Sequence, residues 1–221
     1  MMDLNEIAAE SLRRFEEKSA AREKALVAAR RSIRFSANSI RAIHRGEIDE
    51  AHRLADQSRE QLDQAAAAVR DDHPDLYFSG YVQDAQKEYA ESRLTEALVT
   101  GSDLPGPDEL RVEVAPYLNG MAEAIGEGRR AILDLLRRGE VDASERILGA
   151  MEDMYWVLVS MDFPDAVTGN LRRSTDVSRS IMEKTRGDLS MSLVQRDLRE
   201  ALERHAAEFG KGDEPDRPGE A

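Results

Sequence analysis

Cysteine is absent from this 221-residue chain, and histidine occurs only four times. Without cysteine there can be no disulfide bond and no thiolate zinc site. The sequence also contains no P-loop, no dinucleotide-binding fingerprint and no nucleophile elbow. Few routes to chemistry remain, and clusters of carboxylates that bind a divalent metal are one of them.

Long apolar runs are missing as well. The longest lies at residues 154–159 and is far too short to span a bilayer. The first residues are acidic and lack the apolar segment of a signal peptide. We therefore expect a soluble, cytoplasmic protein that does not associate with a membrane.

Positive charge is scarce, because 31 basic residues face 44 acidic ones and the net charge is −13. Either a highly soluble surface or adaptation to a high-salt cytoplasm explains this balance. The balance also argues against a general nucleic-acid binder, since binding to phosphates depends on positive charge. One segment differs, because residues 22–45 contain seven basic residues and a single acid.

The basic residues of this segment gather on one side of an expected helix. Its apolar stripe consists of Leu26, Ile33, Ala37 and Ile40. Beside the stripe, within about 60° of one another at 100° per residue, are Arg30, Arg34, Arg41 and Arg45. We call these four arginines the basic strip. The basic strip either follows a phosphate backbone or is a solvated face that pairs with acids on neighbouring helices.

Helical periodicity runs through most of the chain, and no segment has the pattern of a strand. The segments expected to be helical are residues 4–45, 48–71, 76–99, 116–138, 142–161, 165–185 and 189–207. The breaks between them include Gly46, Gly139, Gly187 and a loop at residues 100–115. We predict an all-α bundle of about seven helices that forms one domain, residues 1–207. A disordered acidic tail, residues 208–221, is expected to follow it.

Two acidic clusters carry most of the functional information. Asp84, Glu88 and Glu91 share one narrow helical stripe, and Glu123 and Glu127 share another. Hard cations such as Mg²⁺ prefer oxygen ligands, so carboxylates from two helices can hold one or two ions. Spacing alone is weak evidence, because Glu-x-x-Glu also occurs at residues 47–50 and 200–203. The alternative is that these acids are simply solvated.

Further short motifs surround the acidic clusters. They are His-Pro-Asp-Leu-Tyr at residues 73–77, Ser-Gly at 79–80, Gln-Lys-Glu-Tyr-Ala-Glu at 86–91, Tyr-Leu-Asn-Gly-Met-Ala-Glu at 117–123, Gly-Glu at 126–127 and Arg-Gly-Glu-Val-Asp at 138–142. In this order they resemble the translin superfamily, and in particular translin-associated factor X. The resemblance covers about residues 20–187.

The resemblance implies an all-helical, translin-like fold that assembles into a closed octameric shell around a cavity. For the factor X branch it implies a Mg²⁺-dependent endoribonuclease acting on single-stranded RNA or DNA, with three acids facing the cavity. The matching acids are Glu88, Glu91 and Glu123, although the family usually has aspartate where Glu123 stands. Glu127 matches a following glutamate and is a further candidate metal ligand. Lys87 stands where glutamine usually precedes the first glutamate.

The sequence leaves three hypotheses open. The first is an endoribonuclease that uses Mg²⁺, or Mn²⁺ in its place, cleaves single-stranded RNA, and works as a homo-oligomer with an octamer favoured. The second is a non-catalytic, translin-like protein that binds single-stranded RNA or DNA through the basic strip. The third is a helical scaffold with solvated acids. Of the other residues, His44 and His205 are expected at the surface or at an interface, and Tyr89 in the core.

Overall fold

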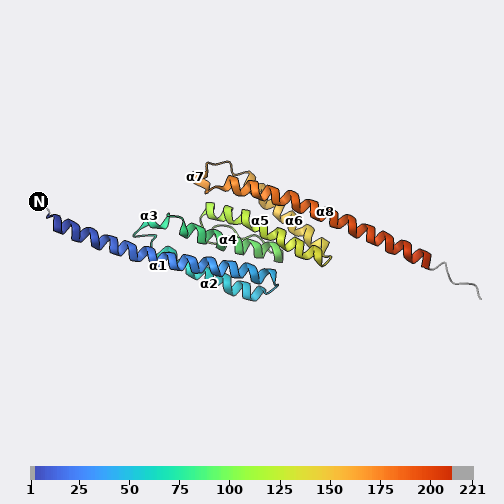
Figure 1. Cartoon of the computed structure of the whole chain (residues 1–221), viewed down its shortest axis with the longest axis horizontal. Coiled ribbons are helices and arrows are strands. Elements are labelled where there is room, and N and C mark those ends of the chain that lie inside the picture. Colours follow the sequence, from blue (N-terminus) through green and yellow to red (C-terminus); the bar gives the residue numbers. More distant parts are fainter. Residues whose placement is uncertain (1–2, 211–221) are drawn as a thin grey trace, which may run out of the picture.

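Helices account for nearly all of the described chain (Figure 1). A computed structural model describes residues 3–210, which form eight helices and no strand. The helices are α1 (Leu4–His44), α2 (Ile48–Ala67), α3 (Pro74–Tyr77), α4 (Tyr81–Thr100), α5 (Val114–Arg137), α6 (Val141–Val159), α7 (Asp165–Thr168) and α8 (Leu171–Gly210). The prediction of an all-α fold is confirmed.

α8 is one continuous helix where the sequence predicts a break. α8 passes through Gly187 without interruption, so the predicted break there is wrong. A glycine inside a helix costs about 1 kcal/mol relative to alanine, but buried Met182 and Leu189 hold the helix against the bundle on either side. α8 also includes residues 208–210 of the expected tail, and residues 211–221 lie outside the described range.

Small residues, rather than the expected apolar stripe, form the buried face of α1. Its buried positions are Ala25, Ala28, Ala29, Ser32, Ser36, Ser39, Ile40, Ala42 and Ile43. Of the expected stripe only Ile40 is buried. The prediction follows the large apolar residues, and it does not detect the serines that form part of the buried face. Ser58 Oγ of α2 lies 2.9 Å from Ser32 Oγ and 2.7 Å from Ser36 Oγ. These bonds satisfy the buried hydroxyls, so α1 and α2 can pack closely through small polar side chains.

α4 and α5 lie in the middle of the bundle, between the α1–α2 hairpin and the pair formed by α6 and α8 (Figure 1). The largest fully buried side chains of the two central helices include Leu94 and Leu98 of α4 and Ile125 and Ile132 of α5. α4 is so enclosed that it buries polar residues too, among them Glu91. Side chains between α4 and α5 are therefore held by packing from both sides.

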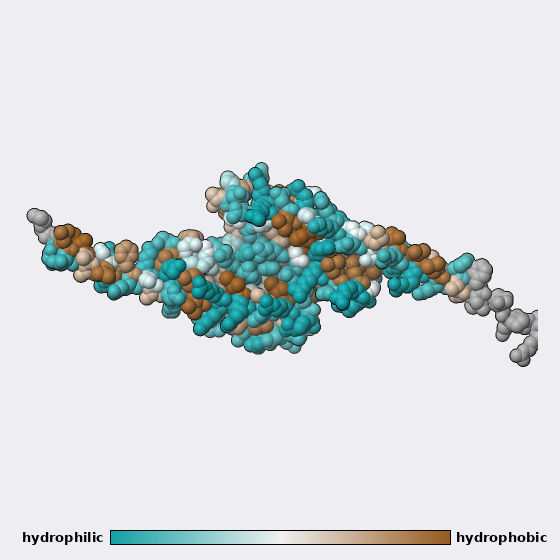
Figure 2. Space-filling model, viewed as in Figure 1, coloured by the Kyte–Doolittle hydropathy of each residue, from teal (hydrophilic) through white to brown (hydrophobic). Residues whose placement is uncertain are grey.

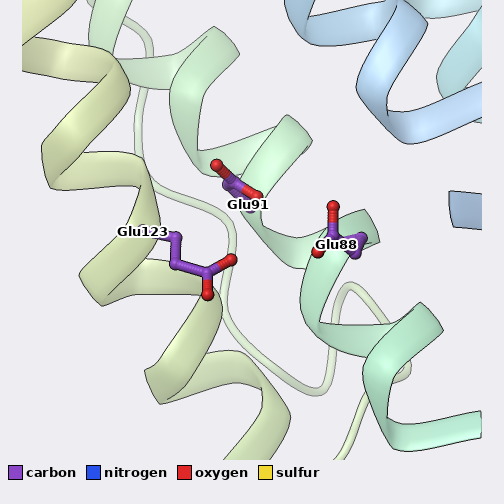
Figure 3. Close-up of side chains that lie close together, drawn as sticks. All are labelled: Glu88, Glu91 and Glu123. Carbon is purple, nitrogen blue, oxygen red and sulfur yellow. The ribbon is translucent and has the colours of Figure 1, made fainter. Parts of the chain in front are cut away.

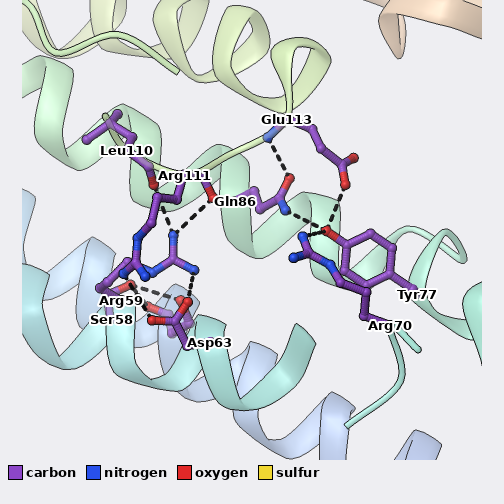
Figure 4. A network of polar contacts seen from close by, with 10 residues as sticks. Ser58, Arg59, Asp63, Arg70, Tyr77, Gln86, Leu110, Arg111 and Glu113 are labelled. Carbon is purple, nitrogen blue, oxygen red and sulfur yellow. Dashed lines mark hydrogen bonds and ion pairs between the residues drawn. The ribbon is translucent and has the colours of Figure 1, made fainter. Parts of the chain in front are cut away.

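A polar network around Tyr77 fixes the point where α5 begins (Figure 4). The Tyr77 hydroxyl donates to Glu113 Oε1 at 2.7 Å and accepts from Arg70 at 2.7 Å and from Gln86 at 3.2 Å. Gln86 Oε1 in turn accepts a hydrogen bond from the backbone nitrogen of Glu113 at 3.2 Å. Since Glu113 directly precedes α5, the network sets how α5 lies along α4.

The first part of α1 and the last part of α8 project beyond the bundle in opposite directions (Figure 1). Apolar side chains are exposed along both projections (Figure 2), among them Leu4, Ile7, Leu12 and Phe15 on α1 and Met191, Val194, Leu198 and Leu202 on α8. No helix within residues 3–210 combines the length and the apolar character needed to cross a membrane.

Candidate metal centre

Three glutamates from two helices converge between α4 and α5 (Figure 3). Glu88 and Glu91 lie one helical turn apart on α4, and Glu123 faces them from α5. One carboxylate oxygen of each residue lies within 4.8 Å of the other two. We call this group the glutamate cluster. The fold thus brings together the three acids that match the family's motifs.

Gly120 allows α5 to approach α4 at this point. A β-carbon at position 120 would lie 2.6 Å from the carbonyl oxygen of Lys87 and 3.0 Å from the backbone nitrogen of Glu91. Contacts this short with backbone atoms cannot be relieved by rotating a side chain, so a larger residue would force the helices apart. The glycine of the Tyr-Leu-x-Gly motif therefore sets the separation across the glutamate cluster.

Lys87 supplies positive charge to the glutamate cluster. Its Nζ donates a 2.7 Å hydrogen bond to Glu123 Oε1 and lies 3.4 Å from Glu88 Oε1. Burial acts to lower the pKa of Lys87, but the hydrogen bond to Glu123 and the charges of both glutamates outweigh it and raise the pKa. Lys87 therefore stays protonated and neutralises part of the cluster.

Lys87 does not remove the penalty for ionising Glu91 and Glu88. Burial, and after it the charges of the neighbouring carboxylates, raises the pKa of Glu91 from 4.5 to about 8. Burial also raises the pKa of Glu88, although the charge of Lys87 acts in the opposite direction. Glu91 is only 9% exposed, so water screens the repulsion poorly.

The glutamate cluster meets the requirements of a hard divalent cation. Such a cation takes oxygen ligands, and Mg²⁺ typically uses one or two carboxylates together with waters and substrate phosphates. Glu88 and Glu123 are partly open to solvent, with side-chain exposures of 26% and 42%, so room remains for other ligands. A cation would also offset the burial and the repulsion that together raise the pKa of Glu91. The donor set therefore fits a metal ion of this class.

Glu127 lies outside the glutamate cluster and has partners of its own. Its Oε2 lies 2.5 Å from Nε2 of His44 and 3.6 Å from Nη1 of Arg130. The hydrogen bond to His44 lowers the pKa of Glu127 despite its burial. His44 is expected at the surface or at an interface, and the surface part of this expectation is wrong, because only 6% of the side chain is exposed. The interface part stays a prediction. Glu127 connects α5 to α1 beside the cluster, and its role as a metal ligand stays a prediction.

Two further expectations about single residues are confirmed. Tyr89 is buried, with 8% of its surface exposed, and the guanidinium carbon of Arg59 lies 5.3 Å from the centre of its ring. Tyr89 therefore points away from the two glutamates that flank it in sequence. His205 is exposed near the end of α8.

Two open pockets adjoin Glu123. The first has a volume of about 400 Å³, and its lining includes Glu91, Glu123, Arg173 and Ser174. The second has a volume of about 580 Å³, and its lining includes Phe78, Asp84, Lys87, Glu123 and Ser174. Because both pockets share Glu123 and Ser174, we treat them as one groove beside the glutamate cluster and call it the cluster groove. Pockets of this size accept groups as large as a nucleotide.

The basic strip lies on an exposed face of α1 and lines neither pocket of the cluster groove. Arg45 pairs with Glu47 at 2.5 Å, and Arg41 donates to the side chain of Asn38 at 2.6 Å. Within residues 3–210, no acid forms an ion pair with Arg30, Arg34 or Arg41. Pairing with acids on neighbouring helices therefore does not account for these three arginines.

No motif in the sequence marks Arg173 and Ser174 as residues of the cluster groove. They lie in the first turn of α8, and only the fold brings that turn beside α5. A prediction would have required the packing of α8 against α5, which helical periodicity does not give. Gln86, by contrast, stands inside the motif at residues 86–91, and its buried bonds to Tyr77 and Glu113 explain that position.

Several known proteins are similar to the chain in sequence or in fold. No protein-family model matches the chain. An uncharacterized protein of Methanocaldococcus jannaschii is 31% identical over 193 residues, which cover 85% of this chain and 83% of that protein. The crystal structure of AfC3PO is 35% identical, has a TM-score of 0.80, and is matched over 86% of this chain and 98% of its own.

Two further structures are also similar to the chain. AfC3PO in complex with duplex RNA is 33% identical, with a TM-score of 0.77 and coverage of 86% of this chain and 97% of that one. Apo-NeC3PO is 18% identical, with a TM-score of 0.74 and coverage of 87% and 98%, and it shows the fold alone. C3PO is the complex of translin and translin-associated factor X. With more than 30% identity over most of both chains, the protein belongs to the translin superfamily.

Proposed function

We propose that the protein is a Mg²⁺-dependent endoribonuclease that cleaves single-stranded RNA at the glutamate cluster. Glu88, Glu91 and Glu123 converge beside an open groove, and this convergence carries the proposal. A protein that only binds RNA gains nothing from three carboxylates at that point, because carboxylates repel a phosphate backbone. The similarity to AfC3PO, which one structure shows in complex with duplex RNA, supports RNA as the substrate class.

The three glutamates would hold the metal in different ways. Glu91 is the most buried and the least free to move, whereas Glu88 and Glu123 are open enough to leave positions for waters and RNA phosphates. When bound, Mg²⁺ would activate a water and stabilise the charge that develops on the cleaved phosphodiester. Mn²⁺ accepts the same oxygen ligands and is the alternative metal. Glu127 is a further candidate ligand, which would first have to release His44.

The proposed enzyme works in the cytoplasm as a homo-oligomeric shell, with an octamer favoured by the resemblance to the family. A shell allows an acidic exterior to coexist with a basic inner wall, so a chain with a net charge of −13 can still hold RNA. The exposed apolar residues on the projecting ends of α1 and α8 offer surfaces that neighbouring copies would cover.

A non-catalytic protein that binds single-stranded RNA or DNA is the second candidate function. Arg30, Arg34 and Arg41 favour it, because they are exposed and form no ion pair within residues 3–210. The glutamate at position 123 favours it too, since its longer side chain changes the geometry that the family's aspartate would give. In this case alanine substitution of the three arginines abolishes binding, and substitution of the glutamate cluster does not weaken it.

Cleavage of a labelled single-stranded RNA by the full chain separates the two functions. The assay compares Mg²⁺ with EDTA, and wild type with Glu88→Gln and Glu123→Gln, at unchanged oligomeric state. Glu50→Gln is a matched control, because Glu50 also belongs to a Glu-x-x-Glu pair but lies outside the cluster, and its partner Arg53 is not part of the basic strip. Metal-dependent cleavage that only the cluster variants lose supports the nuclease. Full activity in either cluster variant contradicts it, and RNA that is bound but not cut favours the second function.

A further inference from the structure

The cluster groove carries one positively charged side chain that nothing in the described chain neutralises. Arg173 lines the same pocket as Glu91 and Glu123, and it is exposed. Within residues 3–210 it forms no ion pair and no side-chain hydrogen bond. Its neighbour Arg172 is different, because Arg172 pairs with Asp162 at 3.2 Å and does not line the groove.

Hydrogen bonds hold the first turn of α8, and with it the backbone of Arg173, beside α5. Ser174 donates a 2.9 Å hydrogen bond to Oδ1 of Asn119, and Nδ2 of Asn119 donates to the carbonyl oxygen of Thr168 at 2.8 Å. Asn119 is only 8% exposed, so these bonds are protected from water. They tie α5 to α7 and α8 at the point where Arg173 enters the groove.

An unpaired guanidinium next to a cluster of carboxylates has a clear chemical use. Arginine presents a planar set of N–H donors that matches two phosphate oxygens at once. The glutamate cluster by itself repels a phosphodiester, so a strand that reaches it needs positive charge nearby. In the metal-free chain Lys87 is not available in the same way, because its ammonium is bonded to Glu123.

An exposed aromatic ring lines the other pocket of the cluster groove. Phe78 is 66% exposed and shares this pocket with Lys87 and Glu123. Its ring makes one edge-to-face contact, with Tyr77 at 4.8 Å between ring centres, and otherwise remains open. Exposed aromatic rings stack with unpaired bases, which are available in a single strand and not in a duplex.

We infer that the cluster groove is the track of a single RNA strand, with Arg173 binding a backbone phosphate and Phe78 stacking on a base. This inference rests on the proposed function, since it places the strand across the glutamate cluster between the two residues. Arg173 would contact only the RNA phosphate backbone, so it would bind both single-stranded and duplex RNA. Phe78 requires an unpaired base and makes the groove select single-stranded over duplex RNA.

Binding is measured without cleavage, so that the inference is tested separately from the nuclease activity. Full-length Glu91→Gln protein in Mg²⁺ is titrated against a labelled single-stranded RNA and against a blunt duplex of the same sequence, and fluorescence anisotropy is recorded. Arg173→Ala and Phe78→Ala are added singly to this background. Arg172→Ala and Phe163→Ala are the matched controls, because both residues are exposed and neither lines the groove.

Arg173→Ala is expected to weaken binding of both RNAs, with partial recovery in Arg173→Lys. It should also reduce the slope of log affinity against log salt by about 0.7 for the single strand, which corresponds to one lost phosphate contact. Phe78→Ala is expected to weaken single-stranded RNA by at least about fivefold and to leave the duplex unchanged. Unchanged thermal melting would show that the variants are folded.

Two results overturn the inference. One is an Arg173→Ala affinity equal to that of Arg172→Ala, and the other is a Phe78→Ala affinity for single-stranded RNA equal to that of Phe163→Ala. Suppose that wild type fails to cleave RNA, while Arg173→Ala and Phe78→Ala weaken RNA binding as described. Then the cluster groove still binds the RNA strand, and the nuclease proposal fails. If cleavage depends on the glutamates but Arg173→Ala and Phe78→Ala bind RNA normally, the nuclease proposal stands and the inferred binding of RNA in the cluster groove fails.

Discussion

The ammonium of Lys87 on α4 donates a 2.7 Å hydrogen bond to Glu123 Oε1 on α5, and so links the two helices that hold the glutamate cluster. In the chain without metal, this bond offsets part of the repulsion among the three carboxylates. A divalent cation would need the same Glu123 oxygens. Lys87 therefore stabilises the cluster and competes with the metal for it.

Lys87→Gln is expected to lower the melting temperature of the metal-free protein and to increase the stabilisation that Mg²⁺ provides. The reason is that the substitution removes the competing cation and leaves the repulsion among the glutamates unrelieved. Melting curves at increasing Mg²⁺ concentration give both quantities for wild type and variant. An unchanged midpoint of the Mg²⁺ dependence would show that Lys87 does not compete with the metal.

Stabilisation by Mg²⁺ is expected to grow with pH, because the metal displaces the proton of Glu91. The folded-state pKa of Glu91, about 8, lies above its ordinary value of 4.5. Proton binding therefore stabilises the metal-free fold fully below pH 4.5, and this stabilisation is lost as the pH rises through about 8. The increase in melting temperature on adding Mg²⁺ should be small near pH 5 and large near pH 9.

Glu91→Gln provides the control for this pH dependence, since glutamine has no proton to exchange with the metal. Because this variant also loses one of the three candidate metal ligands, Mg²⁺ should raise its melting temperature little at either pH value. A Mg²⁺ effect in wild type that is equal at both pH values would contradict the assigned environment of Glu91.

Gly120→Ala is expected to destabilise the fold by about 1–3 kcal/mol, the usual cost of overpacking. The added methyl group would lie 2.6 Å from the backbone oxygen of Lys87, so α5 must move away from α4. Gly149→Ala in α6 is the matched control, because nothing lies within 4 Å of its β-carbon position. In this control the higher helix propensity of alanine should stabilise the protein by about 0.5–1 kcal/mol.

Urea unfolding measures the stability of both glycine variants. The increase in melting temperature on adding Mg²⁺ tests whether the glutamates are still close enough to bind the ion. Gly120→Ala should lose most of the stabilisation by Mg²⁺, while Gly149→Ala should retain it. Equal stability and equal Mg²⁺ response in the two variants would be incompatible with a close approach at Gly120.

Tyr77→Phe is expected to cost about 1–3 kcal/mol, because it leaves buried polar partners without their hydrogen bonds. The Tyr77 hydroxyl joins Arg70, Gln86 and Glu113, and Tyr77 is 2% exposed. Tyr155→Phe serves as the control, since it removes one hydrogen bond at the surface, from Arg179. Its effect should stay within about 0.5 kcal/mol, and a comparable loss in both variants would contradict the role of the Tyr77 network.

Most helix positions in this chain can be predicted from periodicity and glycine. The predictions of single helices at residues 76–99 and 165–185 are wrong, because the chain breaks at Gly80 and Gly169, where φ is 110° and 63°. Gly46 and Gly139 have positive φ angles of 76° and 79° and end helices where the sequence predicts breaks. Gly187 looks the same in sequence but stays helical, because burial of its neighbours along α8 decides the outcome. The buried face of α1 is equally hidden in the sequence, since serines bury only when a partner such as Ser58 satisfies them.

Some features of the candidate site follow from local sequence, and others depend on packing between segments that are far apart in the chain. The pairing of Glu88 with Glu91 follows from helical spacing, and the family's motifs point to Glu123. The distance between them depends on packing at Gly120, which periodicity does not reveal. Arg173 comes from a helix near the end of the chain, so its place in the groove depends wholly on tertiary structure.

Direct binding of Mn²⁺, followed by the electron paramagnetic resonance signal of the free ion, tests the central claim that the glutamate cluster holds a divalent metal. The account predicts that wild-type protein binds Mn²⁺, that Glu91→Gln and Glu123→Gln lose this binding, and that Glu47→Gln keeps it. Glu47 pairs with Arg45 at the surface, so its loss should leave the cluster intact. No binding by wild type, or equal binding by wild type and both cluster variants, would contradict the claim.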